Sequence, residues 1–262
     1  MIEMIEMIAR VESWPRIRRG GGRRRLLPLV FTLATILSPT RAQASGGVQY
    51  WSQGYVEVSP EKSKLRLGIY GEVRTTERAL NVLGIFVGPT LSYEILPYLQ
   101  TSVSAKLLVL RMGGEYEQWQ RLDLELTPKP PRLIGGHLGL GLRNRAELFR
   151  HPASPDAASG VTSTTIRARH RLEIDITLDR AWRLKKIYVN NEWFWGQHFR
   201  HGSLGFTENR LTPLGLQFEV SSFARLNVFY LVQLVHDEES KHWRMATCVG
   251  TFLTIQPARA GR

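Results

Sequence analysis

Hydrophobic and polar side chains alternate with a period of two through the stretch IRARHRLEIDIT, residues 166–177. One face of this stretch carries Ile166, Ala168, His170, Leu172, Ile174 and Ile176. The other face carries Arg167, Arg169, Arg171, Glu173, Asp175 and Thr177. A helix would spread the arginines over more than half of its circumference and leave no apolar stripe. The alternation therefore predicts a long β-strand with one apolar and one ionised face.

The following segment repeats the pattern after a short turn at residues 179–181, so the two segments are expected to form a hairpin. Its apolar side carries Ile187, Val189, Trp193 and Trp195. Its polar side carries Lys186, Tyr188, Asn190 and Glu192.

Strand-like segments separated by turn residues occupy most of the chain after residue 45. They are predicted at residues 48–58, 63–75, 79–93, 98–111, 117–127, 135–149, 162–178, 183–195, 205–220, 223–235 and 242–255. Membrane barrels made of one bacterial chain usually have an even number of strands, so one segment is expected to be misread or missed. We predict ten to twelve strands and favour twelve.

Long strands with a charged face and an apolar face predict an all-β fold, an antiparallel closed transmembrane β-barrel with a polar, charged lumen. Aromatic residues near the strand ends agree with this prediction, because Trp and Tyr gather at membrane interfaces. They are Tyr50, Trp51, Trp119, Trp182, Trp193, Trp195 and Trp243. The pattern alone leaves a second interpretation open, an exported soluble β-sandwich that binds a ligand. In that fold the apolar face would be the core and the charged face would be solvated.

The first 44 residues have the features of a secretory signal peptide. A basic region ending at Arg25 precedes a short apolar run, Leu26 to Leu37, and the small-x-small sequence Ala42-Gln43-Ala44 follows. Cleavage after Ala44 would leave a single barrel domain of residues 45–262. It would also remove eight arginines and three glutamates, so the formal net charge would fall from +12 to +7. We expect export to the outer membrane of a bacterium of the Gram-negative type.

Three connections are longer than the others, at residues 127–134, 151–161 and 196–205. Membrane barrels carry longer loops outside the cell and short turns on the periplasmic side. All three are therefore expected on the extracellular side.

The predicted lumen combines closely spaced charges of both signs. Its expected lining comprises Glu72, Arg74, Arg121, Arg143, Arg145, Glu147, Arg167, Arg169, Arg171, Glu173, Asp175, Glu192 and Arg210. One interpretation is a closed network in which acids and bases neutralise each other at low effective dielectric. The other is a pore whose arginines favour anions.

The remaining chemistry in the sequence is sparse. Basic residues are interleaved with Asp and Glu, so nucleic-acid binding is not expected. The single cysteine, Cys248, permits no internal disulfide and is expected to be buried in a strand. The histidines lack the clustering of metal ligands, and a pair at His198 and His201 is expected to lie in a solvated loop. No metal or cofactor is predicted.

Several polar motifs resemble those of DUF2490, a family of uncharacterised exported proteins predicted to be outer-membrane β-barrels. The motifs are Glu72-Val-Arg74, Arg143-Asn-Arg145-Ala-Glu147, Arg167-x-Arg169-x-Arg171-x-Glu173, Asn190-Asn191-Glu192-x-Phe194, Asn209-Arg210, Pro213-Leu-Gly215 and Tyr230-x-x-Gln233. The resemblance covers most of the chain after the signal peptide. It implies the barrel fold and the outer membrane, and it implies no activity.

A second resemblance is limited to one loop. The sequence His201-Gly202-Ser203, followed by Glu208, is similar to the His-x-Ser arrangement of outer-membrane lipid A deacylases. That resemblance implies a serine nucleophile, His201 as general base and Glu208 as the group that orients the imidazole.

The function favoured by the sequence is a structural barrel or a barrel that transports small solutes or anions. A lipid hydrolase is the alternative, although the sequence as a whole favours a function that is not enzymatic. The expected partners are outer-membrane lipid and a small anionic solute. The sequence does not indicate an oligomeric state.

Overall fold

The computed structural model describes residues 48–60, 63–76, 81–112, 114–151, 163–178, 183–197, 204–237 and 242–256. Within these ranges the chain is all-β and contains no helix long and apolar enough to cross a membrane. Eleven strands are present in the described residues. They are β1 (Val48–Val58), β2 (Leu65–Thr75), β3 (Val82–Leu96), β4 (Leu99–Met112), β5 (Glu115–Pro128), β6 (Leu138–His151), β7 (Ser163–Thr177), β8 (Leu184–Gln197), β9 (Leu204–Ser221), β10 (Ala224–Asp237) and β11 (His242–Ile255).

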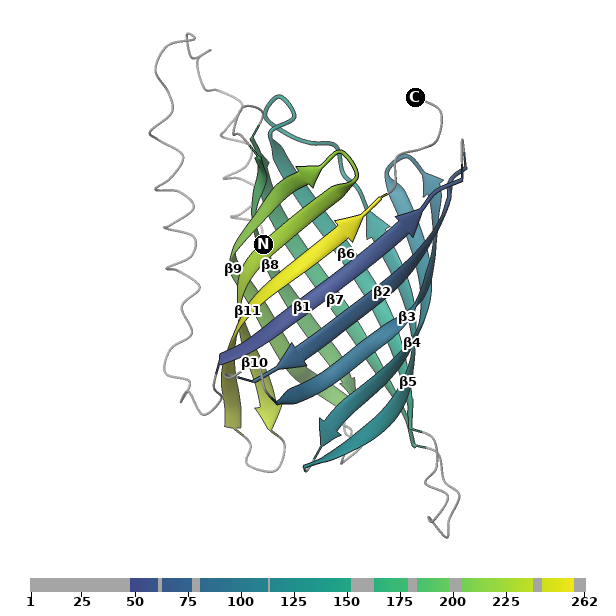
Figure 1. Cartoon of the computed structure of the whole chain (residues 1–262), viewed down its shortest axis with the longest axis vertical. Helices are drawn as coiled ribbons and strands as arrows, with labels where there is room; N and C mark the ends of the chain where they lie inside the picture. The colour runs from purple at the N-terminus through teal and green to yellow at the C-terminus, as the bar shows by residue number, and fades with distance from the viewer. Residues whose placement is uncertain are drawn as a thin grey trace. The chain divides into compact units, whose positions relative to one another are not determined.

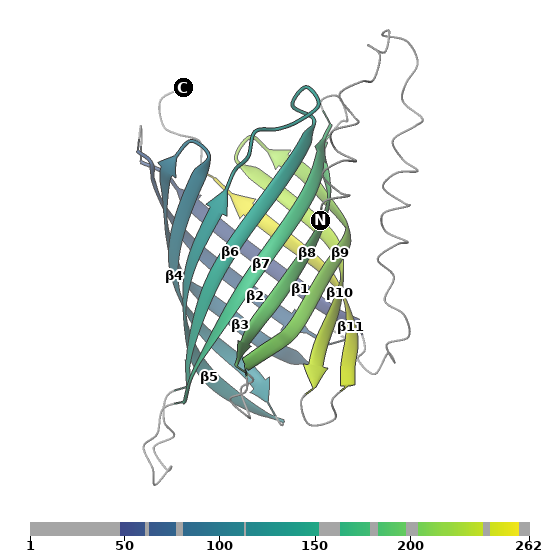
Figure 2. The same ribbon diagram turned by 180° about the vertical axis from the view of Figure 1, so that it is seen from behind.

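The strands form one closed barrel in which each strand pairs with its neighbours in sequence (Figure 1). All sequential pairs are antiparallel, and the barrel closes between β1 and β11, which run parallel. Strands β6 to β8 lie across the barrel from β1 to β3, as the front and rear views show (Figures 1 and 2). The closed barrel excludes the β-sandwich interpretation, because all strands belong to one continuous sheet.

The eleven segments predicted from the sequence are confirmed, and each predicted boundary lies within three residues of the observed one. The preference for twelve strands is wrong for the described residues. An even number was expected because, when all sequential strands are antiparallel, the last strand can pair antiparallel with the first only if the number of strands is even. Here the last strand pairs parallel with the first, and this closure requires an odd number.

The expectation that all three longer connections lie on one side is also wrong. Consecutive connections in an antiparallel barrel fall at opposite ends, and a single strand, β6, separates the connection at 129–137 from the one at 152–162. The strand ends that flank residues 198–203 lie at the same end of the barrel as those that flank residues 152–162, because β7 and β8 run in opposite directions between them.

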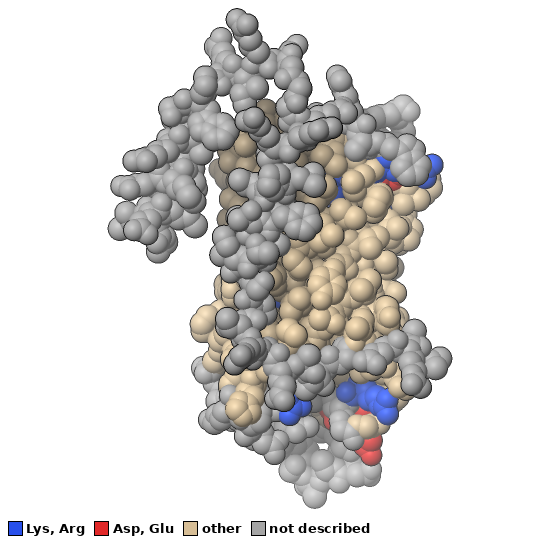
Figure 3. All heavy atoms as spheres, turned by 90° about the vertical axis from the view of Figure 1, so that its left-hand side faces the viewer, with Lys and Arg blue, Asp and Glu red and all other residues tan. Residues whose placement is uncertain are grey.

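The barrel wall is apolar outside and polar inside. Large side chains on the outward face are exposed along most strands, with Ile69, Leu124 and Ile166 each more than half exposed. On the face that it displays, the space-filling view shows a largely uncharged surface across the middle of the described barrel, with Lys, Arg, Asp and Glu visible toward its two ends (Figure 3). The inward face holds the buried charged residues, including Glu72, Asp123 and Glu147. This polarity is the reverse of a water-soluble domain, in which the apolar face of a sheet is buried.

Candidate functional site: a charged lumen with an arginine–aromatic ring

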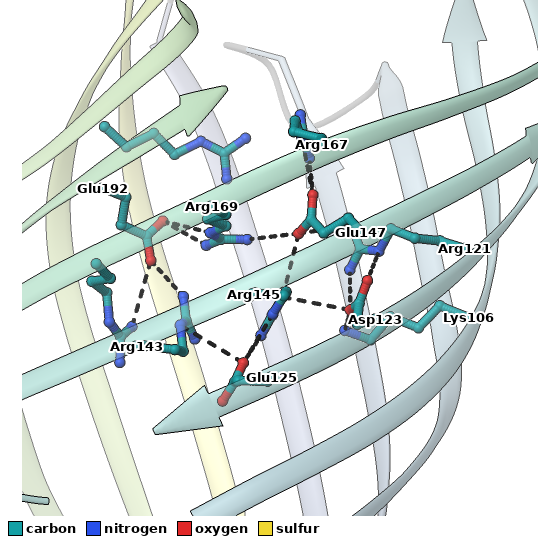
Figure 4. A network of polar contacts seen from close by, with 12 residues as sticks. Lys106, Arg121, Asp123, Glu125, Arg143, Arg145, Glu147, Arg167, Arg169 and Glu192 are labelled. Atoms are coloured by element: carbon teal, nitrogen blue, oxygen red, sulfur yellow. Dashed lines mark hydrogen bonds and ion pairs between the residues drawn. The ribbon is translucent and has the colours of Figure 1, made fainter. Parts of the chain in front are cut away.

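The lumen contains a network of ion pairs that is centred on Glu147 of β6. This carboxylate is completely buried and lies 2.6 Å from Arg167 on the adjacent strand β7 (Figure 4). Arg145, Arg169 and Arg121 approach it at 3.6, 3.6 and 4.0 Å. Four permanently charged guanidinium groups thus surround one carboxylate, a geometry that compensates for burying it.

A second buried carboxylate, Asp123 of β5, lies beside this centre. It accepts a hydrogen bond of 2.7 Å from Lys106 and forms an ion pair of 2.8 Å with Arg121. Arg145 approaches it at 3.5 Å and also binds Glu125 with two guanidinium nitrogens, at 2.6 and 2.9 Å. Arg145 therefore joins three acids into one network (Figure 4).

The network continues across β7 and β8. Glu192 accepts a hydrogen bond from Arg143 with one oxygen and from Arg169 with the other, each at 2.5 Å. Further along the lumen, Glu173 pairs with Lys186 at 2.7 Å. Glu192 and Glu173 thus each have a close basic partner on an adjacent or nearby strand.

Strands β2 and β9 contribute two further pairs. Arg74 and Tyr70 both donate to Glu72, and Arg210 donates to Glu208. Glu208 also accepts a hydrogen bond of 2.6 Å from Gln233 and lies 3.6 Å from Arg167.

Four of these arginines stack on four aromatic rings in a closed circle. We define the arginine–aromatic ring as Trp51, Arg74, Phe86, Arg121, Phe149, Arg167, Phe194 and Arg210. Arg74 lies over Trp51 and Phe86, at 4.1 and 4.5 Å from the ring centroids. Arg121 lies over Phe86 and Phe149, at 6.0 and 5.6 Å.

The circle continues on the other side of the lumen. Arg167 lies over Phe149 and Phe194, at 5.0 and 4.9 Å. Arg210 lies over Phe194 and Trp51, at 4.6 and 5.0 Å, which returns the circle to β1. Cation–π contacts of this kind stabilise by about 2 kcal/mol or more when they are desolvated.

The arginine–aromatic ring draws one residue from each of eight strands. Three further buried residues, Leu108, Leu231 and Cys248, come from the remaining strands β4, β10 and β11. Leu108 packs in a cluster with Phe86 and Phe149, while Leu231 and Cys248 pack with Trp51. Phe194 is completely buried. Little solvent therefore reaches this level of the lumen. Cys248 is a buried strand residue, as its position in the sequence predicts.

A chamber of about 450 Å³ lies between the arginine–aromatic ring and one end of the barrel. Its wall includes Trp51 and Arg210 of the ring and extends to Glu57 and Thr254, each next to the last residue of its strand. Nine basic side chains line it, namely Arg74, Lys106, Arg121, Arg143, Arg145, Arg169, Arg171, Lys186 and Arg210. Five acidic side chains line it, namely Glu57, Glu72, Glu125, Glu173 and Glu192. The chamber wall therefore has an excess of positive charge.

Three aromatic side chains of the chamber lie against the wall over glycines, and one of them is Tyr55, which lies over Gly68. A Cβ atom at Gly215 would lie 2.1 Å from the ring of Tyr188, and one at Gly250 would lie 2.1 Å from the ring of Phe229. Only glycine permits this close approach of a ring to the neighbouring strand. The rings consequently lie along the wall and leave the chamber free.

The structure places all thirteen residues of the predicted lumen lining inside the barrel. Ten of them line the chamber. The other three, Glu147, Arg167 and Asp175, lie behind the chamber surface in ion pairs, and Asp175 pairs with Arg132 near the rim. Residues that the sequence interpretation did not select as lining include Lys106, Asp123 and Glu125. Their period-two spacing on β4 and β5 was the available signal.

Two aromatic predictions are wrong. Trp51 and Trp119 were expected at a membrane interface, but both are buried inside the lumen. They share a strand face with inward polar residues, Trp51 with Gln53 and Trp119 with Arg121, so the parity of the strand directs them inward. Position near a strand end does not by itself place an aromatic residue outside.

The alternative catalytic group is only partly within the described residues, because His201 and Ser203 lie outside them. Glu208 lies inside the lumen and is held by Arg210, Arg167 and Gln233. Its described contacts make it a member of the charge network. Among the described residues no group of three or more His, Cys, Asp or Glu could hold a metal ion.

A model of a protein family of unknown function, DUF2490, matches residues 48–245. The chain belongs to this family. The matched region covers the barrel from β1 into β11. The search of curated proteins and the search of solved structures find no match.

The polar motifs that resemble DUF2490 proteins supply the lumen of this barrel. Glu72 and Arg74 form one pair beside the arginine–aromatic ring, and the arginines of β6 and β7 surround Glu147 and Glu192. Phe194 of the motif on β8 is stacked by three arginines, Arg167, Arg169 and Arg210. In this DUF2490 protein the charged motif residues of β2, β6, β7 and β8, together with Phe194, are thus among the groups that fill the barrel.

Proposed function

We propose that this DUF2490 protein is an outer-membrane β-barrel that takes up small anions into a positively charged chamber. The observation that carries the proposal is the polarity of the wall, apolar outside and charged inside. A bilayer favours this arrangement, because lipid accepts the outer leucines, isoleucines and valines while the lumen stays polar. Exposed apolar surface of this extent is uncommon on monomeric soluble proteins. An odd-numbered membrane barrel is known in mitochondria, so eleven strands are compatible with the proposal.

The charge of the chamber supports an anionic solute. Seven of its nine basic side chains are arginines, which stay protonated at all physiological pH values. Five glutamates of the lining neutralise part of this charge, and Asp123, Glu147 and Glu208, directly behind the lining, pair with Lys106, Arg169 and Arg210. The remaining positive potential in a confined lumen attracts anions and repels cations, as rings of Arg or Lys do in selective channels.

The arginine–aromatic ring limits passage through the barrel. Its side chains are mostly buried and are held by ion pairs as well as by stacking. A solute that enters the chamber must displace this ring to cross. We therefore propose uptake into the chamber with a lumen that is closed at rest.

The first test is cell fractionation. We expect the full-length protein to appear in the outer-membrane fraction and to resist extraction with high salt or alkaline carbonate, because a closed barrel is held by its apolar surface. Migration in SDS gels should differ between boiled and unboiled samples. Recovery of the protein in the soluble periplasmic fraction would refute the membrane assignment.

The second test concerns the arginine–aromatic ring. Phe194→Ala removes a completely buried ring that separates Arg167 from Arg210, so the variant should conduct in planar bilayers and should prefer anions. The wild type should conduct weakly or not at all. Trp195→Ala is the matched control, because it removes a larger aromatic side chain from the adjacent, outward position. Equal conductance of wild type and Phe194→Ala would contradict closure, and a cation-selective current would contradict the anion proposal.

A further inference from the structure

The chamber has two chemically different walls. Strands β6 to β8 supply the cationic wall, with Arg143, Arg145, Arg169, Arg171 and Lys186. Strands β1, β3 and β4 supply a wall that is mostly neutral, with Gln53, Tyr55, Thr90, Ser92, Gln100 and Ser102 beside the charged Glu57 and Lys106. Because β6 to β8 face β1 to β3 across the lumen, a solute in the chamber meets both walls (Figures 1 and 2).

Arg171 is the arginine of the cationic wall whose hydrogen-bond donors are least occupied by other residues. Its side chain is 32% exposed, more than that of Arg143, Arg145 or Arg169. Its nearest carboxylate oxygens, on Glu173 and Glu192, are 3.7 Å away. These distances are too long for hydrogen bonds, so in the described structure the guanidinium donors of Arg171 face the chamber unused.

Arg143 lies directly opposite Arg171 in the register of β6 and β7. Its Nε atom is buried away from the chamber, has no hydrogen-bond partner among the described residues and lies 3.8 Å from Glu125, so Arg143 contributes charge at this place. Two like charges directly across a strand pair destabilise the sheet unless an anion lies between or beside them. Glu192 compensates for one side of the pair through its hydrogen bond with Arg143. On the chamber side, the donors of Arg171 remain for a second anion.

The acids nearby do not compete for these donors. Glu173 is held by Lys186 at 2.7 Å, and Glu192 is held by Arg143 and Arg169 at 2.5 Å. Positive charge and unused N–H donors therefore coincide at one place on the wall. Guanidinium groups bind phosphate and carboxylate oxygens in pairs of parallel hydrogen bonds.

We propose that the chamber binds a small hydroxylated anion, a sugar phosphate or sugar acid. Arg171 holds its anionic group beside the charge of Arg143, and the mostly neutral wall of β1, β3 and β4 receives its hydroxyl groups. This inference rests on the proposed function, since it names the class of anion that enters the chamber. The chamber volume of about 450 Å³ lies within the range of small-molecule sites. Its polar lining matches a hydroxylated solute better than an apolar one, which would leave the wall groups unsatisfied.

The test is titration calorimetry on the refolded full-length barrel in detergent, with glucose 6-phosphate, glucuronate, inorganic phosphate and glucose as separate probes. Glucose 6-phosphate or glucuronate should bind more tightly than inorganic phosphate, and glucose should bind weakest. Arg171→Gln should weaken binding of the anionic sugar about tenfold or more, the effect of losing a charge-assisted hydrogen bond. Arg150→Gln is the matched control, because it removes the same charge from an outward, exposed position on β6.

A variant of the facing wall separates the two parts of the site. Gln53→Leu should weaken binding of glucose 6-phosphate and leave binding of inorganic phosphate unchanged. Circular dichroism and heat-modifiable migration identify any variant that fails to fold, and Gln53→Leu keeps the cationic wall intact. Equal affinity for phosphate and glucose 6-phosphate would overturn the sugar assignment and leave the anion chamber standing. If no anion binds, or if Arg171→Gln binds as the wild type does, the anion site itself is wrong.

Discussion

Glu147→Gln is expected to lower the free energy of unfolding by about 3–5 kcal/mol, the cost of removing one partner from a buried ion pair. Glu147 is completely buried and has Arg121, Arg145, Arg167 and Arg169 within 4.0 Å. The amide keeps the size of the side chain but removes the charge that compensates these four guanidinium groups. Urea unfolding of the barrel in lipid vesicles, followed by tryptophan fluorescence, measures the change.

A partly exposed acid provides the control for this experiment. Glu219 pairs with Lys185 at 3.2 Å near one end of the barrel, and both side chains are more than 40% exposed. Glu219→Gln should change the free energy of unfolding by about 0.5 kcal/mol or less.

The double variant Glu147→Gln with Arg167→Gln tests why the free energy of unfolding falls. Removing one cation together with the carboxylate leaves less uncompensated charge, so the two changes should couple by about 1–3 kcal/mol. Strictly additive losses would show that the ion pair of Glu147 and Arg167 is not what stabilises this part of the lumen. A Glu147→Gln variant as stable as the wild type would contradict the role of the whole network.

The barrel wall could be predicted from the sequence because the side-chain period of a strand is short and strict. On β7, alternation alone separated Arg169 and Arg171 from Ile166 and Leu172, and a slip of one residue would have exchanged the two faces. The same rule puts Phe194 on the face of Glu192 and Phe149 on the face of Glu147, although neither was predicted to line the lumen. What the sequence predicted well is therefore the orientation of side chains within each strand.

The partners of those side chains could not be predicted, because they depend on the register between strands. Arg143 lies opposite Arg171, and Arg145 lies opposite Arg169, yet Arg145 pairs with Glu125 of β5, while Arg143 and Arg169 both pair with Glu192 of β8. The arginine–aromatic ring shows this dependence on the register between strands more clearly. Its eight residues are spread from Trp51 to Arg210 and become neighbours only when the barrel closes. Nothing in the spacing along the chain indicates that circle.

The strand number was mispredicted for a related reason. Eleven segments were visible in the sequence, but the rule of even strand numbers suggested a twelfth. Whether the first and last strands close parallel or antiparallel is a property of the whole barrel. The pairing of Tyr50 with Val249 in parallel orientation has no local sequence signal.

Leu124→Arg is expected to destabilise the barrel in a bilayer by about 2–4 kcal/mol, the cost of an arginine on the lipid face near the midplane. Leu124 lies in the middle of β5, points outward and is 57% exposed. In a water-soluble protein the same substitution at so exposed a position would change stability by about 0.5 kcal/mol or less. The experiment therefore distinguishes a lipid-facing wall from a solvated one.

Tyr98→Arg is the matched control, because Tyr98 is equally exposed, at 58%, but lies in the turn between β3 and β4. An arginine there reaches the membrane surface and should cost about 0–1 kcal/mol. Folding into lipid vesicles, read as the fraction with heat-modifiable migration, should fall for Leu124→Arg and stay near the wild-type level for Tyr98→Arg. If both variants fold with wild-type yield and stability, the outer face of β5 is not in contact with lipid, and the apolar band must have another partner.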